Sequence, residues 1–335
     1  MWPLTWPAWA TCSAVKNMPH QSPATHAMLL AAGLGNRLKP LTNNLPKCLM
    51  PIANQPLLKL ALKRLQLMGV GQVVVNTHYL ASQVEDYIST LASGLSISIS
   101  HEPLLLGTGG ALQKAGAKLG SRPFWVMNAD IVFDLDLTLL PALMERDNAI
   151  LCLGLIDNPQ FNSVAVDDNG RLLGVKGYQA LADDMPLLTY SGIAYMRPGF
   201  LDYLPAGGPA DVLEGWFKAM AAGETIVGVK LKGFWDDLGT WQHLWATNQK
   251  AALGQLPGFI EPPAVLKGEN VAIDSGAQLQ GFCFLSDNAR IAHNAFVKNS
   301  VLLPGAVAGA GSHIENSIIG KDFAAQGNYI NDAFA

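Results

Sequence analysis

The segment LAAGLGNRLKPLTNNLPK, Leu30 to Lys47, decides the fold of the first part of this chain. The apolar run HAMLLAA at 26–32 leads directly into it, and Gly33 and Gly35 follow where a buried strand would end. Because glycine has no side chain, backbone N–H groups in such a turn can approach a phosphate closely. Arg37 adds positive charge beside the turn. The segment therefore predicts an anion-binding turn at the end of a strand.

Length and composition limit the classes of protein that this chain can represent. Its 335 residues exceed what one core usually organises, which predicts two domains. The net charge of −4, with 14% charged residues and no basic block, argues against a nucleic-acid partner. No run approaches the ~18 apolar residues of a membrane span, so we expect no membrane association. The N-terminal residues 1–25 lack the pattern of a signal peptide and are predicted to be a disordered extension.

The cysteines are scattered, with no C-x-x-C pair among them. This usage is typical of reduced thiols, so we expect a cytoplasmic protein without zinc or structural disulfides. The cysteines are Cys12, Cys48, Cys152 and Cys283.

Short apolar runs alternate with helix-length periodic segments over the first two thirds of the chain. This alternation predicts an α/β domain with a mostly parallel sheet and helices on both faces. Ligands of such sheets bind at the carboxyl ends of the strands. Predicted strands lie at 26–32, 72–77, 95–100, 124–130 and 149–156, and predicted helices near 56–68, 81–92, 110–119 and 136–146.

The pattern changes after about residue 257, where small or aliphatic residues recur at a spacing of six. This hexapeptide repeat is typical of a parallel β-helix of about three coils, with the repeated side chains turned inward. One register holds Ile273, Leu279, Leu285, Ile291, Val297 and Leu303. The second holds Val265, Val271, Ala277, Cys283, Ala289, Ala295, Val301 and Val307.

The first segment differs from the common phosphate loops. A dinucleotide fingerprint needs a glycine where Leu38 stands, and a P-loop needs Gly-Lys-Ser/Thr, which is absent. The pattern L-A-A-G-x-G-x-R-x-x-P-L-T followed by P-K resembles the signature of sugar-1-phosphate nucleotidylyltransferases. The resemblance covers about residues 27–250 and is nearest to mannose-1-phosphate guanylyltransferases. It implies a Rossmann-like fold of the GT-A type at 26–255 and a short left-handed β-helix domain at 256–335.

The resemblance also implies roles for the residues of the segment. Arg37 would bind the β- and γ-phosphates that leave as pyrophosphate, and Lys47 would face the α-phosphate. Lys39 is closer to the turn but is expected to be a solvated surface residue. The nucleotide-binding residues would be Leu30, Ala32, Gly33, Leu34, Gly35 and Asn36, together with Gly107, Thr108 and Gly109 of the element EPLLLGTGGAL, where glycine lets the backbone approach the base.

Two aspartates are expected to hold Mg²⁺, which prefers carboxylate and phosphate oxygens. Asp130 ends the apolar strand FWVMNAD, and Asp237 lies in WDDLGT, which resembles the family element W-x-D-x-G-T. That spacing favours Asp237 over the neighbouring Asp236. Taken singly, either aspartate is also compatible with a helix cap or a turn.

The sugar site is expected around Asn128, Lys176 and Gly192, the last in the strand TYSGIAYMRP. Relatives often carry Glu-Lys-Pro before that strand, whereas this chain reads GVKGYQA, so Lys176 lacks the glutamate. The expected substrates are a nucleoside triphosphate and a sugar-1-phosphate, with GTP and mannose-1-phosphate as the leading pair. Uridylyl or thymidylyl transfer to another sugar-1-phosphate and a non-catalytic nucleotide-sugar sensor stay open as alternatives.

The β-helix leaves two roles to weigh. An acyltransferase usually needs a catalytic histidine and a longer array, and this chain offers His293 and His313 on a short one. We favour an assembly or regulatory role, in which the open ends of the coil support a homo-oligomer.

Overall fold

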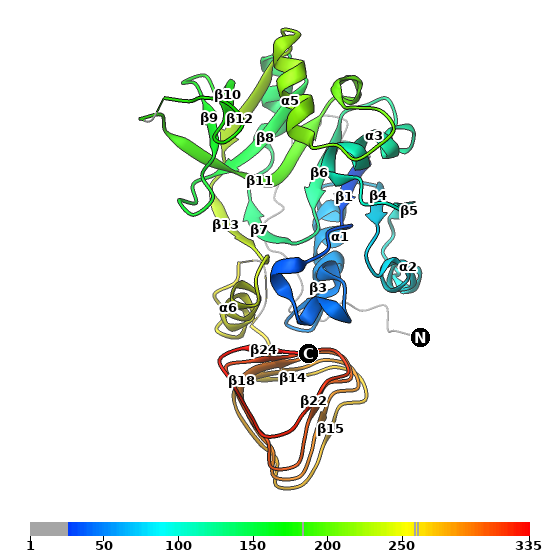
Figure 1. Ribbon diagram of the computed structural model, residues 1–335, viewed down its shortest axis with the longest axis vertical. Coiled ribbons are helices and arrows are strands. Elements are labelled where there is room, and N and C mark those ends of the chain that lie inside the picture. Colours follow the sequence, from blue (N-terminus) through cyan, green and yellow to red (C-terminus); the bar gives the residue numbers. More distant parts are fainter. Residues whose placement is uncertain (1–25, 183, 258, 260) are drawn as a thin grey trace.

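The computed structural model describes residues 26–335 except 183, 258 and 260. The predicted disordered extension at 1–25 lies outside the described residues. The larger part of the molecule is an α/β domain, and a three-sided coil of strands lies against one end of it (Figure 1).

The sheet of the α/β domain joins two parallel groups of strands through one antiparallel strand. β1 (His26–Leu30) pairs in parallel with β4 (Gln72–Thr77) and β6 (Phe124–Asn128), and β4 pairs with β5 (Ser96–His101). β8 (Leu151–Ile156) pairs in parallel with β12 (Ile226–Lys230). β11 (Leu187–Met196) runs antiparallel to β6 and β8, and at its far end pairs with β9 (Val164–Val166), which pairs with β10 (Leu172–Val175). The mostly parallel sheet predicted from the sequence is confirmed.

Helices cover both faces of this sheet, and its central strand β1 is apolar on both faces. Ala27 and Leu29 of β1 pack into the core that includes α1 (Leu57–Leu67) and α4 (Leu139–Arg146). Met28, between them, packs into the opposite core with α3 (Gly107–Leu119) and α5 (Val212–Ala221). The remaining helices are α2 (Ala81–Thr90), α6 (Trp241–Ala252), and the 3₁₀ turns η2 (Asn36–Leu38), η3 (Leu41–Asn43), η4 (Lys47–Leu49) and η5 (Pro198–Tyr203).

Two short strand pairs lie beside the main sheet. β2 (Pro51–Ile52) and β3 (Gln55–Pro56) form a hairpin directly after η4. β7 (Ile131–Leu135) follows β6 and pairs antiparallel with β13 (Gly233–Asp237). Neither pair was predicted from the periodicity of the sequence.

The C-terminal part is a parallel β-helix. One side stacks β14 (Val265–Lys267), β16 (Gln278–Leu285), β18 (Phe296–Leu302), β20 (His313–Glu315) and β23 (Asn328–Ile330), with β21 (Ile318–Ile319) and β24 (Ala333–Phe334) completing that sheet. A second sheet stacks β15 (Ala272–Ile273), β17 (Arg290–Ile291), β19 (Val307–Ala308) and β22 (Ala324–Ala325).

The spacing of six holds only as far as Val297, and the prediction was wrong for the last residues of both registers. Gln278 pairs with Phe296, whereas Cys283 pairs with Ser300, so one residue fewer separates the second pair. A slip of one residue turns each following side chain to the other face of its strand. Leu302 therefore fills the interior of the coil, as do Ala306 and Ala308. Leu303 and Val301 instead pack against the α/β domain, and Val307 is only half-buried.

Candidate active site

Three charged side chains from distant parts of the chain meet beyond the carboxyl end of β6. Lys47 begins η4, Asp130 follows β6, and Asp237 ends β13. The Lys47 ammonium donates to Asp130 Oδ2, and its Nζ lies 3.6 Å from Asp237 Oδ1. The Lys47 side chain is only 11% exposed, so the two carboxylates rather than water balance its charge. A predicted catalytic residue and both predicted metal ligands are thus brought together.

The pairing of β7 with β13 creates this meeting. It places Asp237 opposite Ile131, and the N–H of Leu238 donates to the carbonyl oxygen of Asp130 at 3.1 Å. Asp130, directly before β7, and Asp237, at the end of β13, therefore lie close together although 106 residues stand between them in the sequence. Cys48, next to Lys47, is fully buried, and burial raises the pKa of its thiol to about 12. This cysteine therefore stays protonated and takes no part in the ionic cluster.

Arg37 borders the cluster on its solvent side. Its Nη2 lies 3.3 Å from Asp237 Oδ2, and its side chain is 59% exposed. A Cβ atom at Gly239 would lie 2.4 Å from the same nitrogen, so glycine at this position leaves room for the guanidinium. Most of the guanidinium therefore stays available to an anion.

The glycine turn is shaped by Gly35 and left open at Gly33. Gly35 has φ 64, and its carbonyl oxygen accepts a hydrogen bond of 2.9 Å from Thr42 Oγ1. A Cβ atom at Gly33 would meet nothing within 4 Å. The turn thus has one packed face and one face open for a ligand. The other predicted loop residues are the buried Ala32, the half-buried Leu30 and Leu34, and the exposed Asn36.

Two buried polar residues to which the sequence analysis gave no role hold this turn. Asn76 Oδ1 accepts from the N–H of Ala31 at 2.7 Å, and Asn76 Nδ2 donates to Glu102 Oε1 at 2.8 Å. Glu102 Oε2 accepts from the N–H of Leu106 at 3.0 Å. Asn76 and Glu102 are 4% and 1% exposed. Their signal in the sequence was a polar residue near the end of the strand QVVVNT and a glutamate directly after the strand SISISH.

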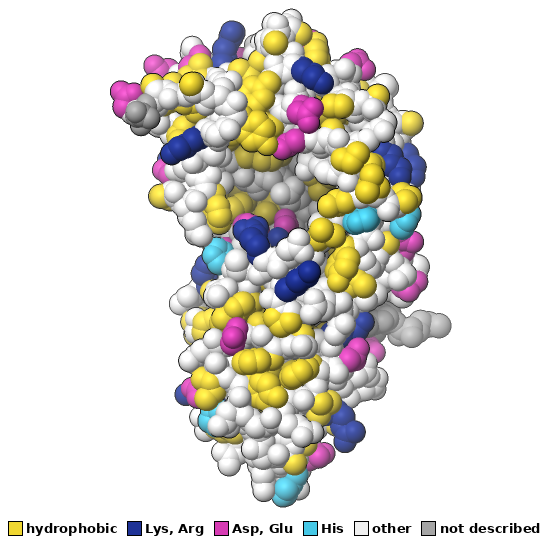
Figure 2. Space-filling model, in the orientation of Figure 1, with side chains coloured by type: hydrophobic (Ala, Val, Ile, Leu, Met, Phe, Trp, Pro, Cys, Tyr) yellow, Lys and Arg dark blue, Asp and Glu magenta, His cyan; other side chains and the backbone are white. Residues whose placement is uncertain are grey.

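A cavity of about 300 Å³ opens beside the charged cluster. Gly192, with φ 78, forms part of its wall, and a Cβ atom there would lie 2.7 Å from Asn128 Nδ2. In Figure 2 this face of the molecule is hollowed, and basic and acidic side chains gather at the edge of the hollow. The lining residues are Arg37, Asn128, Asp130, Ile131, Phe161, Ser163, Thr189, Tyr190, Ser191, Gly192, Trp235 and Asp237.

Trp235 lines the cavity, and the sequence predicted no role for it beyond its place in the W-x-D motif. Its indole Nε1 donates to the carbonyl oxygen of Ser191 at 2.8 Å, which ties β13 to β11. Because side chains alternate along a strand, Trp235 and Asp237 share one face, and both line the cavity. The W-x-D spacing is therefore the spacing of one strand face.

Comparisons with known proteins identify the family of this chain. Residues 26–175 match the nucleotidyl transferase family of domains. The chain is 35% identical over 223 residues to N-acetylmuramate alpha-1-phosphate uridylyltransferase of Neisseria meningitidis serogroup B, a match that covers 64% of this chain and 93% of that protein. This chain belongs to the sugar-1-phosphate nucleotidylyltransferases.

Other relatives of this nucleotidylyltransferase match both of its domains. UTP–glucose-1-phosphate uridylyltransferase of Synechocystis is 28% identical over 88% of this chain and 82% of its own length. The catalytic subunit beta of mannose-1-phosphate guanylyltransferase of Drosophila melanogaster is 27% identical over 88% of this chain and 84% of its own length. UDP-glucose pyrophosphorylase from Acinetobacter baumanii shares the fold, with a TM-score of 0.60 and 17% identity over 70% of this chain and 95% of that one.

The two carboxylates of this nucleotidylyltransferase fit a magnesium ion. Asp130 and Asp237 contact the same ammonium group from two sides and are 29% and 20% exposed, so a ligand can reach them. Among the described residues, no group of three or more His, Cys, Asp or Glu side chains could hold a metal ion. Mg²⁺ commonly takes one or two carboxylates and completes its shell with substrate phosphates and water. A magnesium site that is completed by oxygens of a bound triphosphate is consistent with a nucleotidylyltransferase.

The glycines in the first turn of α3 approach protein backbone rather than open space. A Cβ atom at Gly107 would lie 2.8 Å from the carbonyl oxygen of Ala210, and one at Gly109 would lie 2.9 Å from that of Asp211. The N–H of Gly109 donates to Ala210 O at 3.0 Å. Close packing on the segment before α5 is therefore one reason for glycine at these two positions. Thr108 is half-buried between them, and nucleotide binding by all three residues stays a prediction.

Lys176 lies outside the residues that line the cavity. Its side chain is exposed, and its backbone N–H donates to the carbonyl oxygen of Ser163, a lining residue, at 2.7 Å.

The part of the chain that the structure describes contains no helix long and apolar enough to cross a membrane.

Proposed function

We propose that a nucleoside triphosphate binds at the Gly33–Asn36 turn and that a sugar-1-phosphate binds in the adjoining cavity. The phosphate oxygen of the sugar attacks the α-phosphorus, the bond from the α-phosphorus to the bridging oxygen breaks, and pyrophosphate leaves. The observation that carries this proposal is the meeting of Lys47, Asp130 and Asp237 at the border between the turn and the cavity.

The protein's own residues position the substrates and neutralise charge. Lys47 donates to a non-bridging oxygen of the α-phosphate, where negative charge develops, and Arg37 binds the departing phosphates. Asn128 and Gly192 shape the wall on which the sugar lies. The attacking phosphate oxygen is already an anion, so the reaction needs no general base.

Asp130 and Asp237 would hold Mg²⁺. When bound, this ion supplies further neutralisation of the triphosphate charge. Lys47 would then share the two carboxylates with it and turn its ammonium toward the α-phosphate.

GTP with mannose-1-phosphate is the leading substrate pair. The match to the Drosophila mannose-1-phosphate guanylyltransferase subunit supports it, and the Synechocystis uridylyltransferase matches an equal share, 88%, of this chain. Uridylyl transfer is the second candidate, since the Neisseria and Synechocystis uridylyltransferases are 35% and 28% identical to this chain.

The test is pyrophosphate release in the presence of Mg²⁺ across a matrix of nucleoside triphosphates and sugar-1-phosphates. Release confined to GTP with mannose-1-phosphate supports the leading pair, and another productive pair reassigns the substrates within the same chemistry. No release from any pair, together with nucleotide-sugar binding, would establish a sensor instead.

Association of copies through the ends of the β-helix and a cytoplasmic location stay predictions. β23 and β24 form the last coil, and Ile330 on it is 46% exposed. Light scattering after size-exclusion chromatography measures the oligomeric state.

A further inference from the structure

The hairpin that follows Lys47 contacts the β-helix. Ala53 and Asn54 join β2 to β3 with φ values of 45 and 58, as in a two-residue type I′ turn. The side-chain amide Nδ2 of Asn54 lies 2.9 Å from the carbonyl oxygen of Leu285 and 3.4 Å from that of Leu266. Leu266 is in β14 and Leu285 is in β16, which are neighbouring coils. A single amide therefore contacts two coils of the β-helix a few residues after Lys47.

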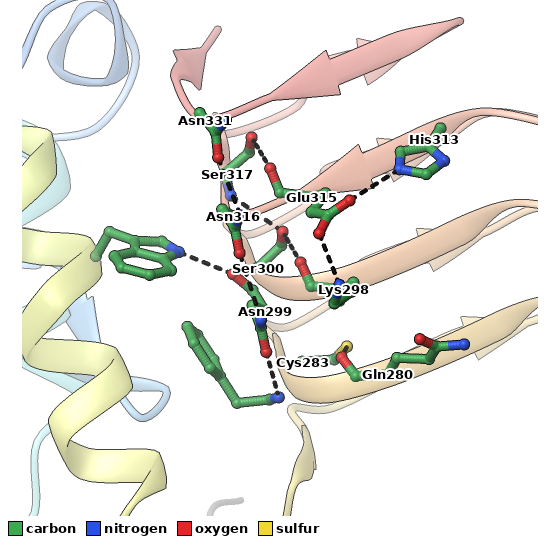
Figure 3. Close-up of polar contacts among 12 residues, drawn as sticks. Gln280, Cys283, Lys298, Asn299, Ser300, His313, Glu315, Asn316, Ser317 and Asn331 are labelled. Atoms are coloured by element: carbon green, nitrogen blue, oxygen red, sulfur yellow. Dashed lines mark hydrogen bonds and ion pairs between the residues drawn. The ribbon is translucent and has the colours of Figure 1, made fainter.

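The helix that follows Asp237 is attached to the same β-helix. The indole Nε1 of Trp245, in α6, donates to the carbonyl oxygen of Asn299 at 2.8 Å. The Trp245 ring also packs on Phe282 of the coil, with ring centroids 5.8 Å apart. Figure 3 shows Asn299, with Asn316 stacked above it, at the corner of the coil that faces the helix. Asp237 is thus also followed closely by a segment held by the β-helix.

A buried asparagine joins the two attached segments to each other. Asn248 of α6 is fully buried, and its Oδ1 accepts from the N–H of Ala53 at 2.9 Å. Its Nδ2 donates to the carbonyl oxygen of Pro51 at 3.1 Å. The hairpin, α6 and the β-helix therefore contact one another pairwise through specific hydrogen bonds.

Apolar packing makes this contact part of the main core. The one-residue slip in the coil turns Val301 and Leu303 toward the α/β domain, where they join Phe284 and Ile318. These four side chains are at most 1% exposed. The β-helix is consequently packed as a continuation of the domain rather than as a loosely docked module.

We propose that Asn54 is a positioning residue through which the β-helix holds Lys47 against Asp130 and Asp237. This inference rests on the proposed function, since the held lysine is the one that meets the α-phosphate. Lys47 and Asp237 come from separate segments, and the β-helix is the common support of both. A misplacement of about 1 Å between reacting groups costs on the order of a hundredfold in rate. Loss of the contact that holds Lys47 in place should therefore lower kcat.

Two substitutions in the full-length chain remove the Asn54 donor without forcing the turn out of shape. Asn54→Gly keeps the left-handed backbone, and Asn54→Asp keeps the shape of the side chain but cannot donate to Leu285 O. Asn294→Gly is the matched control, because Asn294 is an exposed asparagine of the coil with φ 58. It follows β17, whose sheet includes β15 and β22, and Figure 1 shows these on a side of the coil away from α6.

The readouts are steady-state kinetics and hydrogen exchange, on variants first shown to be folded by circular dichroism. We expect kcat to fall about tenfold in both Asn54 variants, while the KM of each substrate stays within about twofold of the wild-type value. Because the variants are first shown to be folded, a lower kcat cannot come from a smaller amount of folded protein. The amide of Met50, which donates to Lys47 O at 3.0 Å, should exchange faster in both. Asn294→Gly should match the wild type in both measurements.

Wild-type kcat and unchanged exchange at Met50 in both folded Asn54 variants would overturn the inference. If the wild-type chain releases pyrophosphate with no substrate pair, the proposed function fails and the exchange measurement alone decides whether Asn54 holds the Lys47 segment.

Discussion

Asp236 and Asp237, neighbours on β13, point to opposite sides of the strand. Asp237 Oδ2 lies 3.3 Å from Arg37 Nη2 in the cavity, whereas Asp236 Oδ1 lies 3.0 Å from His243 Nδ1 on the face that meets α6. Asp236 Oδ2 also accepts from Thr247 Oγ1 at 2.9 Å. Because side chains alternate along a strand, Asp237 faces the cavity and Asp236 faces α6, so two chemically identical side chains have different roles.

Substitution of each aspartate by asparagine should separate a role in turnover from a role in stability. We expect Asp237→Asn to lower kcat by about 10²-fold or more with little change in thermal stability, because a charge in the cavity is lost. Asp236→Asn should lower stability by about 1–3 kcal/mol, because its partners on α6 lose a buried acceptor. Pyrophosphate release and thermal unfolding measure the two effects. Loss of turnover in a fully stable Asp236→Asn variant would contradict the assignment.

Removal of the Lys47 ammonium tests the centre of the cluster. We expect Lys47→Ala and Asp130→Ala each to reduce turnover by orders of magnitude, about 10²–10³-fold, while the chain stays folded. Lys39→Ala is the matched control, because Lys39 is exposed on the same segment, and its kcat should stay within about twofold of the wild type. Near-normal turnover in Lys47→Ala or Asp130→Ala would remove the basis of the proposed mechanism.

The two glycines of the turn should respond differently to an added methyl group. A Cβ atom at Gly35 would lie 2.7 Å from Thr42 Cγ2, and its φ of 64 disfavours alanine, so Gly35→Ala should cost about 1–2 kcal/mol of stability. Gly33 has open space at the same position. Gly33→Ala should leave the melting temperature unchanged and raise KM for the triphosphate several-fold, about threefold or more, where the backbone approaches phosphate. An unchanged KM would place the triphosphate elsewhere.

Alkaline pH should weaken the fold through its buried thiols. Burial raises the pKa of Cys48 from 9.0 to about 12 and that of Cys152 from 9.0 to about 12. The unfolded chain then releases these protons at lower pH than the folded chain, so stability is complete below pH 9 and falls as pH rises from 9 toward 12. Each thiol contributes a slope of about 1.4 kcal/mol per pH unit in that window.

Urea unfolding at several pH values between 8 and 10.5 measures this slope. Cys48→Ala should show a shallower decline than the wild type, and both should coincide in slope at neutral pH. Equal slopes in the two proteins above pH 9 would show that the Cys48 thiol ionises without opposing the fold.

Local patterns in the sequence predicted much of the fold. The strands at β1, β4, β5, β6 and β8 and the helices α1 to α4 follow from apolar periodicity, which reports the face that each element buries. The hexapeptide spacing predicted the β-helix for the same reason. It was wrong after Val297, because one residue fewer separates the paired positions there and the following side chains turn to the other face of the strand.

The functional site, like the fold, was predicted only in part from the sequence. The motif letters identified Arg37, Lys47, Asp130 and Asp237. They did not include Asn76, and they included Glu102 only as the first letter of EPLLLGTGGAL, whereas the buried hydrogen bonds show what both side chains hold. Nor did they show that Gly107 and Gly109 meet the backbone before α5.

The sequence by itself determined which residues carry the charges, which segments become strands and helices, and to which family the motifs point, because these depend on neighbours within a few residues. The tertiary structure decided that Lys47 lies between Asp130 and Asp237, and that Asn54 and Asn248 link their segments to each other and to the β-helix. Those contacts join residues up to 231 positions apart. Only the packing of whole elements against one another brings such residues within hydrogen-bonding distance.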